Sequence, residues 1–181
     1  MSTMSQADGR VARLCRSALM LALAFGLSFL EHLLPLQLLL PLPGVKLGLA
    51  NIVTVVLFYF VSPIDAAVVS LLRIGLSALL FGTPISFFFA VSGGLLAYLT
   101  LLLCRPLYGR FFSFVGVSVL SATGHHLGQM AAAVTLFESG VLLTYLPVLL
   151  PAGILTGTLT GLLLNCCTPQ LEKLLKRGRN E

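Results

Sequence analysis

Long apolar runs separated by short polar breaks dominate the pattern of this chain. Prolines, glycines and the few charged residues divide it into six hydrophobic segments, most of them close to the roughly 20 residues that a helix needs to cross a bilayer. The pattern therefore predicts an all-α integral membrane protein with six transmembrane helices. The expected spans are residues 17–34, 46–61, 64–81, 84–104, 112–138 and 145–166.

Composition removes the soluble alternative. Hydrophobic residues make up 57% of the 181 residues and charged residues only 9%, against about 25% charged in soluble domains. Too little polar surface remains to cover a water-soluble globule, so we expect the functional groups to lie within the membrane. We predict a basic N-terminal segment at 1–16, a six-helix transmembrane domain at 17–167 and a basic amphipathic tail at 168–181.

The basic residues predict an orientation. If six helices cross, nearly all Lys and Arg side chains outside the spans fall on one side, which the positive-inside rule assigns to the cytoplasm. Both termini are then cytoplasmic, and the net charge of +5 needs no nucleic acid as a partner. These residues are Arg10, Arg13, Arg16, Arg105, Arg110, Lys173, Lys176, Arg177 and Arg179.

The connection between the first two spans is rich in proline. Pro35, Pro41 and Pro43 exclude a regular helix there. Irregular backbone at membrane depth is tolerated only where it packs on protein or lines a wet cavity. We therefore expect this stretch to cap a site in the outer half of the protein.

Polar side chains within the spans are the candidates for that site, because each is costly in hydrocarbon. They gather from mid-membrane outward, as in a cup that opens to the outside. Lys46 at the start of span two can attract an anionic ligand, or its amine can extend to lipid headgroups. The expected substrate-binding residues are Lys46, Asn51, Arg73, His125, Gln129 and Glu138.

The fifth span carries one polar helical face. Its positions recur at spacings of four, four and three: Ser121, His125, Gln129 and Ala132. We interpret His125 and Gln129 as facing a ligand. The alternative is an interhelical hydrogen-bond network in which Arg73 pairs with Glu31 or Glu138 to neutralise a buried charge.

Small residues recur every fourth position on two spans, a pattern that allows close helix contact in lipid. For the sixth span we favour packing within the same subunit. The first span is more open to a contact between molecules. The two stripes are Ala18, Ala22 and Gly26, and Gly153, Gly157 and Gly161.

Several catalytic motifs are absent. The chain has no Gly-Lys dipeptide, so it has no Walker A loop for ATP hydrolysis, and transport energy must come from a partner. Asp8 and Asp65 are its only aspartates, too few for a paired-carboxylate magnesium site for a diphosphate. We expect a subunit that is not an enzyme and holds neither a cofactor nor a metal.

Four motifs together suggest a family: PGVKLGLAN, LLRIGLSALLFG, SGGLLAYL and ATGHHLGQMAAA. Over nearly its whole length the chain resembles the bacterial Gx transporter family, also labelled heptaprenyl diphosphate synthase component I. That family is similar to the substrate-binding S components of energy-coupling-factor importers. These are six-helix proteins that capture a small molecule outside and dock on a transmembrane coupling subunit driven by two ATPases.

The resemblance implies roles for particular residues. S components dock through an alanine stripe on their first helix, which matches Ala18 and Ala22 here and continues as Gly26. It also implies a ligand site in the outer half, but no ligand identity. Two alternatives stay open: a membrane subunit associated with heptaprenyl diphosphate synthase, and an ion-coupled transporter using Glu31, Arg73 and His125.

Overall fold

The protein is an all-helical bundle in a computed structural model that describes residues 2–34 and 48–177, with side chains from 9–34 and 48–170. These parts of the chain contain six α-helices, two short 3-10 helices and no β-strand. The elements are α1 (Ser2–Leu33), α2 (Asn51–Phe60), α3 (Pro63–Phe81), α4 (Pro84–Cys104), η2 (Arg105–Leu107), α5 (Phe114–Phe137), η3 (Gly140–Tyr145) and α6 (Leu146–Arg177).

The six expected helices are all present. α3 and α4 follow the expected spans within a residue, whereas α1 begins at Ser2 and α6 continues to Arg177, well beyond the apolar runs. The expected divisions at 16/17 and 167/168 therefore fall inside continuous helices. Lys46 and the proline-rich stretch lie outside the described residues.

Four stretches of helix in the described chain are long and apolar enough to cross a membrane: 9–33, 63–81, 84–107 and 140–170. α2 has only 10 residues, and α5, with 24 residues, carries buried serine, histidine and glutamine side chains along an otherwise apolar sequence. Large apolar side chains cover the outside of the bundle, with Leu79 being 84% exposed. That surface suits lipid. Crossing by all six helices and the cytoplasmic position of the termini stay predictions.

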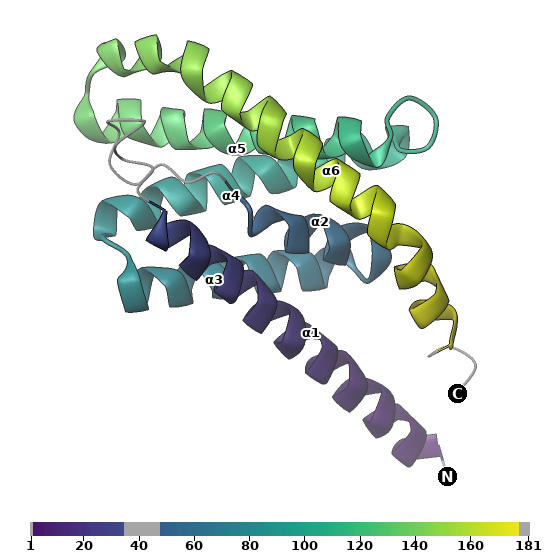
Figure 1. Cartoon of the computed structure of the whole chain (residues 1–181). Helices are drawn as coiled ribbons and strands as arrows, with labels where there is room; N and C mark the ends of the chain where they lie inside the picture. The colour runs from purple at the N-terminus through teal and green to yellow at the C-terminus, as the bar shows by residue number, and fades with distance from the viewer. Residues whose placement is uncertain (1, 35–47, 178–181) are drawn as a thin grey trace.

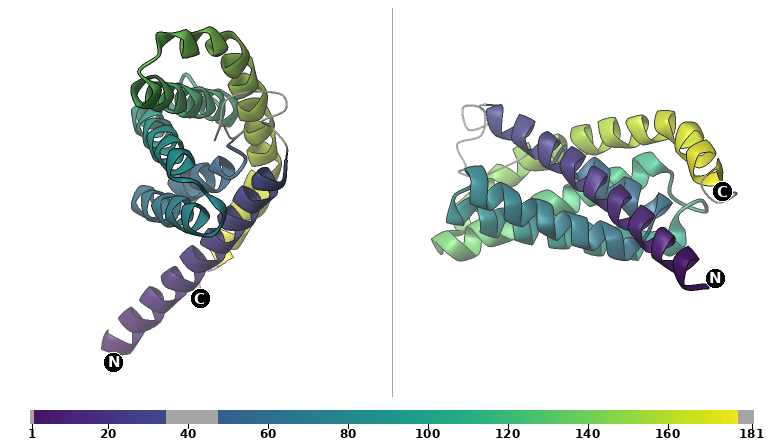
Figure 2. Two further views of the ribbon diagram at one scale, coloured as in Figure 1. Left: turned by 90° about the vertical axis from the view of Figure 1, so that its left-hand side faces the viewer. Right: turned by 90° about the horizontal axis from the view of Figure 1, so that it is seen from below.

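The chain runs back and forth along the bundle, and its two termini lie at the same end (Figures 1 and 2). α4, α5 and α6 pack side by side, and α1 packs on α3. The short helix α2 contacts each of the other five helices. It therefore occupies the centre of the fold.

Local signals explain where α4 begins. Pro84 stands in the first turn of α4, where a missing backbone N–H costs nothing. Before it, Thr83 and Ser86 form a capping box: Ser86 N donates to Thr83 Oγ1 at 3.1 Å, and Thr83 N donates to Ser86 Oγ at 2.8 Å.

Near the termini, Arg13 of α1 donates to both carboxylate oxygens of Asp65 in the first turn of α3, at 2.7–3.1 Å. This ion pair fixes α1 against α3.

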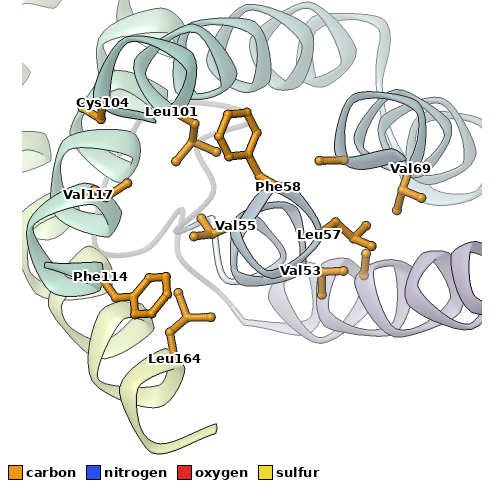
Figure 3. Close-up of a cluster of buried hydrophobic side chains, with 12 residues drawn as sticks. Val53, Val55, Leu57, Phe58, Val69, Leu101, Cys104, Phe114, Val117 and Leu164 are labelled. Atoms are coloured by element: carbon orange, nitrogen blue, oxygen red, sulfur yellow. The ribbon is translucent and has the colours of Figure 1, made fainter. Parts of the chain in front are cut away.

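The main apolar core fills the half of the bundle near the termini. α2 lies between α1 and α3 on one side and α4, α5 and α6 on the other (Figure 3). Aromatic rings add to this packing: the rings of Phe58 and Tyr98 meet edge to face at 5.6 Å, and those of Tyr59 and Tyr108 lie 4.7 Å apart. The buried members are Ala24, Val53, Val55, Leu57, Phe58, Ala66, Val69, Leu101, Cys104, Phe114, Val117 and Leu164.

Glycines let α5 approach both of its neighbours closely. A Cβ added to Gly128 would lie 2.4 Å from the carbonyl oxygen of Ser92 on α4, and one added to Gly157 would lie 2.5 Å from Cα of Val119. Only a hydrogen fits at these positions. The interpretation of the α6 stripe as packing within the subunit is confirmed, because Gly153, Gly157 and Gly161 all lie against the backbone of α5.

Candidate functional site

Polar side chains are buried in the half of the bundle away from the termini. We call them the polar cluster; they come from α1, α2, α3 and α5. Each is at most 9% exposed, in a fold whose other buried side chains are mostly apolar. The members are Ser28, Glu31, Asn51, Arg73, Ser77, Ser121, His125, His126 and Gln129.

Arg73 is the buried cation of the cluster, 7% exposed near the middle of α3. Its Nη1 donates to Ser28 Oγ on α1 at 3.0 Å, while its Nε is buried without a hydrogen-bond partner among the described residues. Glu31, one turn after Ser28, attracts the guanidinium electrostatically. This attraction favours the network alternative, in which the pairing of Arg73 with Glu31 stays a prediction.

The residues at the start of α2 connect the surroundings of Arg73 to α5. Leu49 N donates to Glu31 Oε1 at 2.8 Å, and Asn51 Nδ2 donates to Ser121 Oγ on α5 at 3.0 Å. Between α1 and α5, Gly48 has φ +83° and lies against the ring of His125. A short stretch of backbone thus touches both sides of the cluster.

His125 lies in a slot between helices. A Cβ added to Gly93 of α4 would lie 2.8 Å from its Cε1 and 2.9 Å from its Nδ1, so only glycine admits the imidazole there. Ser121, one turn earlier on α5, donates to the carbonyl oxygen of Ala97 at 3.4 Å. The polar face of α5 is therefore turned toward α2 and α4.

His126 and Gln129 form a second buried pair on α5. Because an amide oxygen only accepts, His126 Nδ1 donates to Gln129 Oε1, at 3.3 Å. Neither His126 Nε2 nor Gln129 Nε2 has a hydrogen-bond partner within the described chain. The rings of His125 and His126 lie 5.9 Å apart, so the pair adjoins the slot of His125. One acceptor and one donor are thus buried and available to a ligand.

The structure brings together most of the expected binding residues. Asn51, Arg73, His125 and Gln129 are all buried in the polar cluster. Glu138 is not part of it: this residue is exposed and ends α5 in left-handed conformation, at φ 48°. Lys46 falls outside the described residues.

Three members of the polar cluster were missed by the sequence reasoning about binding: Ser28, Ser77 and His126. Each serine lies one helical turn from another polar residue, Ser28 before Glu31 and Ser77 after Arg73, and that spacing was the available signal. A serine by itself does not indicate a binding site, because its hydroxyl can hydrogen-bond to a backbone carbonyl of its own helix. His126 follows His125 directly in the sequence, so it lies off the helical face on which the prediction for His125 and Gln129 rested.

The small-residue stripe on α1 lies open. Ala18, Ala22 and Gly26 are exposed, and a Cβ added to Gly26 would meet nothing within 4 Å. Leu19 and Leu23 beside them are also more than half exposed. This face of α1 is thus not used for packing within the described part of the chain.

The cluster offers a guanidinium, a carboxylate, amides, imidazoles and hydroxyls beside apolar side chains, and such a mixture suits the binding of a small molecule. Among the described residues, no three His, Cys, Asp or Glu side chains are grouped to hold a metal ion.

Comparison with known proteins identifies the family. The family model described as heptaprenyl diphosphate synthase component I matches residues 20–167. No curated protein and no solved structure matches the chain. The match covers every residue of the polar cluster, and it agrees with the apolar helices of a multi-pass membrane protein. The chain therefore belongs to the heptaprenyl diphosphate synthase component I family.

Proposed function

We propose that this protein is the substrate-binding subunit of an ATP-driven importer of the energy-coupling-factor type. It sits in the cytoplasmic membrane with both termini inside and captures a small polar molecule from the outer side. A transmembrane coupling subunit and two ATPases complete the importer. The protein itself catalyses no reaction.

The polar cluster is the observation that carries this proposal. Buried polar atoms without partners cost folding free energy, of order 1–3 kcal/mol for each group. Arg73 Nε, Ser77 Oγ, His126 Nε2 and Gln129 Nε2 all lack a hydrogen-bond partner in the described chain. A ligand that pairs with these atoms would repay part of that cost on binding, as expected of a capture site.

Two further features support an importer subunit. The sequence has no Walker A loop, so a transport cycle needs ATPases from outside this chain. The stripe Ala18, Ala22 and Gly26 is exposed and small, which allows the backbone of a partner helix to approach closely.

The test is purification of the tagged full chain from its native membrane in mild detergent, followed by mass spectrometry of the proteins that accompany it. We expect two ATPases and one membrane coupling subunit in amounts comparable to the tagged chain. Their absence, with a soluble prenyl synthase chain in their place, would overturn the proposal.

The family description favours a second candidate, a membrane subunit that works with a soluble heptaprenyl diphosphate synthase chain. In that case prenyl transfer by the soluble chain should depend on addition of this protein in lipid vesicles. Equal rates with empty vesicles and with vesicles that contain the protein would eliminate this candidate.

A further inference from the structure

We infer that Arg73, Ser28 and Ser77 form an oxyanion subsite within the polar cluster, and that the captured molecule carries a carboxylate or phosphate group that binds there. This inference rests on the proposed function, because it assigns a chemical class to the ligand of that same site. It also separates the cluster into a part on α1 and α3, around Arg73 and Glu31, and an amide–imidazole part on α2 and α5.

The first argument is the incomplete pairing of the guanidinium. Arginine carries five N–H donors, arranged to match the two oxygens of a carboxylate or phosphate. In this protein Nη1 donates to Ser28 Oγ, and Nε is buried without a hydrogen-bond partner in the described chain. The Nε donor of Arg73 therefore remains for a ligand.

The second argument is the position of the serines. Ser77 follows Arg73 by one turn of α3, is 3% exposed, and its Oγ has no hydrogen-bond partner among the described residues. Ser28, from α1, already contacts the guanidinium. Hydroxyl donors beside a guanidinium suit a tetrahedral or planar oxyanion, which accepts several hydrogen bonds at once.

The third argument concerns Glu31, the nearby carboxylate. Its Oε1 accepts the backbone N–H of Leu49 at 2.8 Å, so part of its hydrogen-bonding capacity is used by the chain entering α2. Glu31 lowers the cost of burying Arg73 electrostatically. An anionic ligand would then be held by directed hydrogen bonds from Arg73 and the two serines. The uncharged part of the ligand would extend toward residues 48–51 and lie near His125.

The experiment follows the unfolding temperature of the purified full chain in detergent. Sodium phosphate or sodium acetate is compared with sodium chloride at equal ionic strength and pH. Binding to the folded state at about ten times Kd should raise the midpoint by about 3 °C with phosphate or acetate, but not with chloride. No response to either oxyanion over chloride would overturn the inference.

Substitutions separate a binding role from a structural one. Arg73→Met should lower the midpoint without oxyanion, because it leaves the buried Glu31 carboxylate without its cation, and should abolish the oxyanion response. Ser77→Ala should keep the fold and reduce the response. The matched control is Arg13→Met, which removes the ion pair to Asp65 but should leave the oxyanion response intact.

Three other outcomes would count against the inference. An Arg73→Met variant that keeps the full response would place the anion elsewhere. A response to phosphatidylglycerol vesicles over phosphatidylcholine vesicles, without one to soluble oxyanions, would assign the subsite to a lipid headgroup. If Ser77→Ala keeps the full oxyanion-dependent rise in unfolding temperature, Ser77 is not part of the subsite. The importer proposal can fail separately, because co-purification of ATPases does not depend on this measurement.

Discussion

Two stripes of small residues look alike in the sequence but have opposite surroundings in the fold. Gly153, Gly157 and Gly161 of α6 lie against the backbone of α5, so close that no Cβ fits without a shift. Ala18, Ala22 and Gly26 of α1 have the same spacing and are exposed.

The difference shows what a small-residue pattern indicates in a membrane protein. Close helix approach, rather than burial of apolar area, is a main source of attraction in lipid. The pattern therefore marks a contact, whereas only the fold tells whether the partner lies in the same chain. A stripe that the described residues leave uncovered is a candidate contact with another molecule.

The largest expected effect on folding comes from a larger side chain placed in the contact between α5 and α6. Gly157→Leu should prevent folding or lower the free energy of unfolding by at least about 3 kcal/mol, because its Cβ would overlap the backbone of α5. Fluorescence-detected size exclusion and thermal unfolding in detergent measure this. The matched control, Gly26→Leu, has open space and should unfold within about 2 °C of the wild type. Equal damage in both variants would contradict the comparison.

Larger side chains in the α1 stripe should weaken assembly with the coupling subunit, rather than folding. Ala18→Leu with Ala22→Leu should leave the unfolding temperature nearly unchanged, since both positions are exposed, but should weaken recovery of the coupling subunit at least about tenfold, or about 1.4 kcal/mol. Quantitative mass spectrometry of the purified complex measures this. Leu79→Ala, on an exposed part of α3, is the control and should not alter recovery. Full recovery with the leucine pair would refute the docking face.

A smaller effect is expected where the α5–α6 contact meets the polar cluster. In Gly153→Ala the added Cβ would lie 2.9 Å from His126 Cδ2 and 3.3 Å from Thr123 Cα, so the imidazole must shift. We expect a loss of about 1–2 kcal/mol in thermal unfolding. Gly75→Ala on α3 has open space and should gain up to about 1 kcal/mol from helix propensity. A stabilised Gly153→Ala variant would contradict this account.

The smallest effect should come from an unpartnered hydroxyl. Ser118 Oγ on α5 is buried with no hydrogen-bond partner in the described chain, so Ser118→Ala should be neutral or slightly stabilising. Ser121→Ala is the informative contrast, because Ser121 accepts from Asn51 and donates to Ala97. We expect it to cost about 1–2 kcal/mol in thermal unfolding. The reverse order of the two variants would show that Ser118 has a partner.

Much of this fold followed from the sequence. The proline-marked starts of α3 and α4 were expected within a residue, because proline in a first helical turn is a strong local signal. The extension of α1 to Ser2 was not, because polar residues carry no apolar period there. α2 also proved shorter than its apolar run, beginning at Asn51.

The site was only partly predictable. Helical spacing placed His125 and Gln129 on one face of α5, and both are buried in the cluster. Spacing cannot show which helix lies opposite, so the contact of Arg73 with Ser28 was not foreseen. Glu138 was expected in the outer half by its position alone, yet the end of α5 leaves it exposed.

The central claim is that the α1 stripe docks a membrane partner, and cross-linking in the native membrane tests it most directly. A photoreactive residue replaces Ala22 or, as the control, Leu79, which is also exposed. The account predicts one protein adduct at position 22, containing a membrane coupling subunit that co-purifies with ATPases, and none at position 79. Lipid adducts alone at both positions would contradict it.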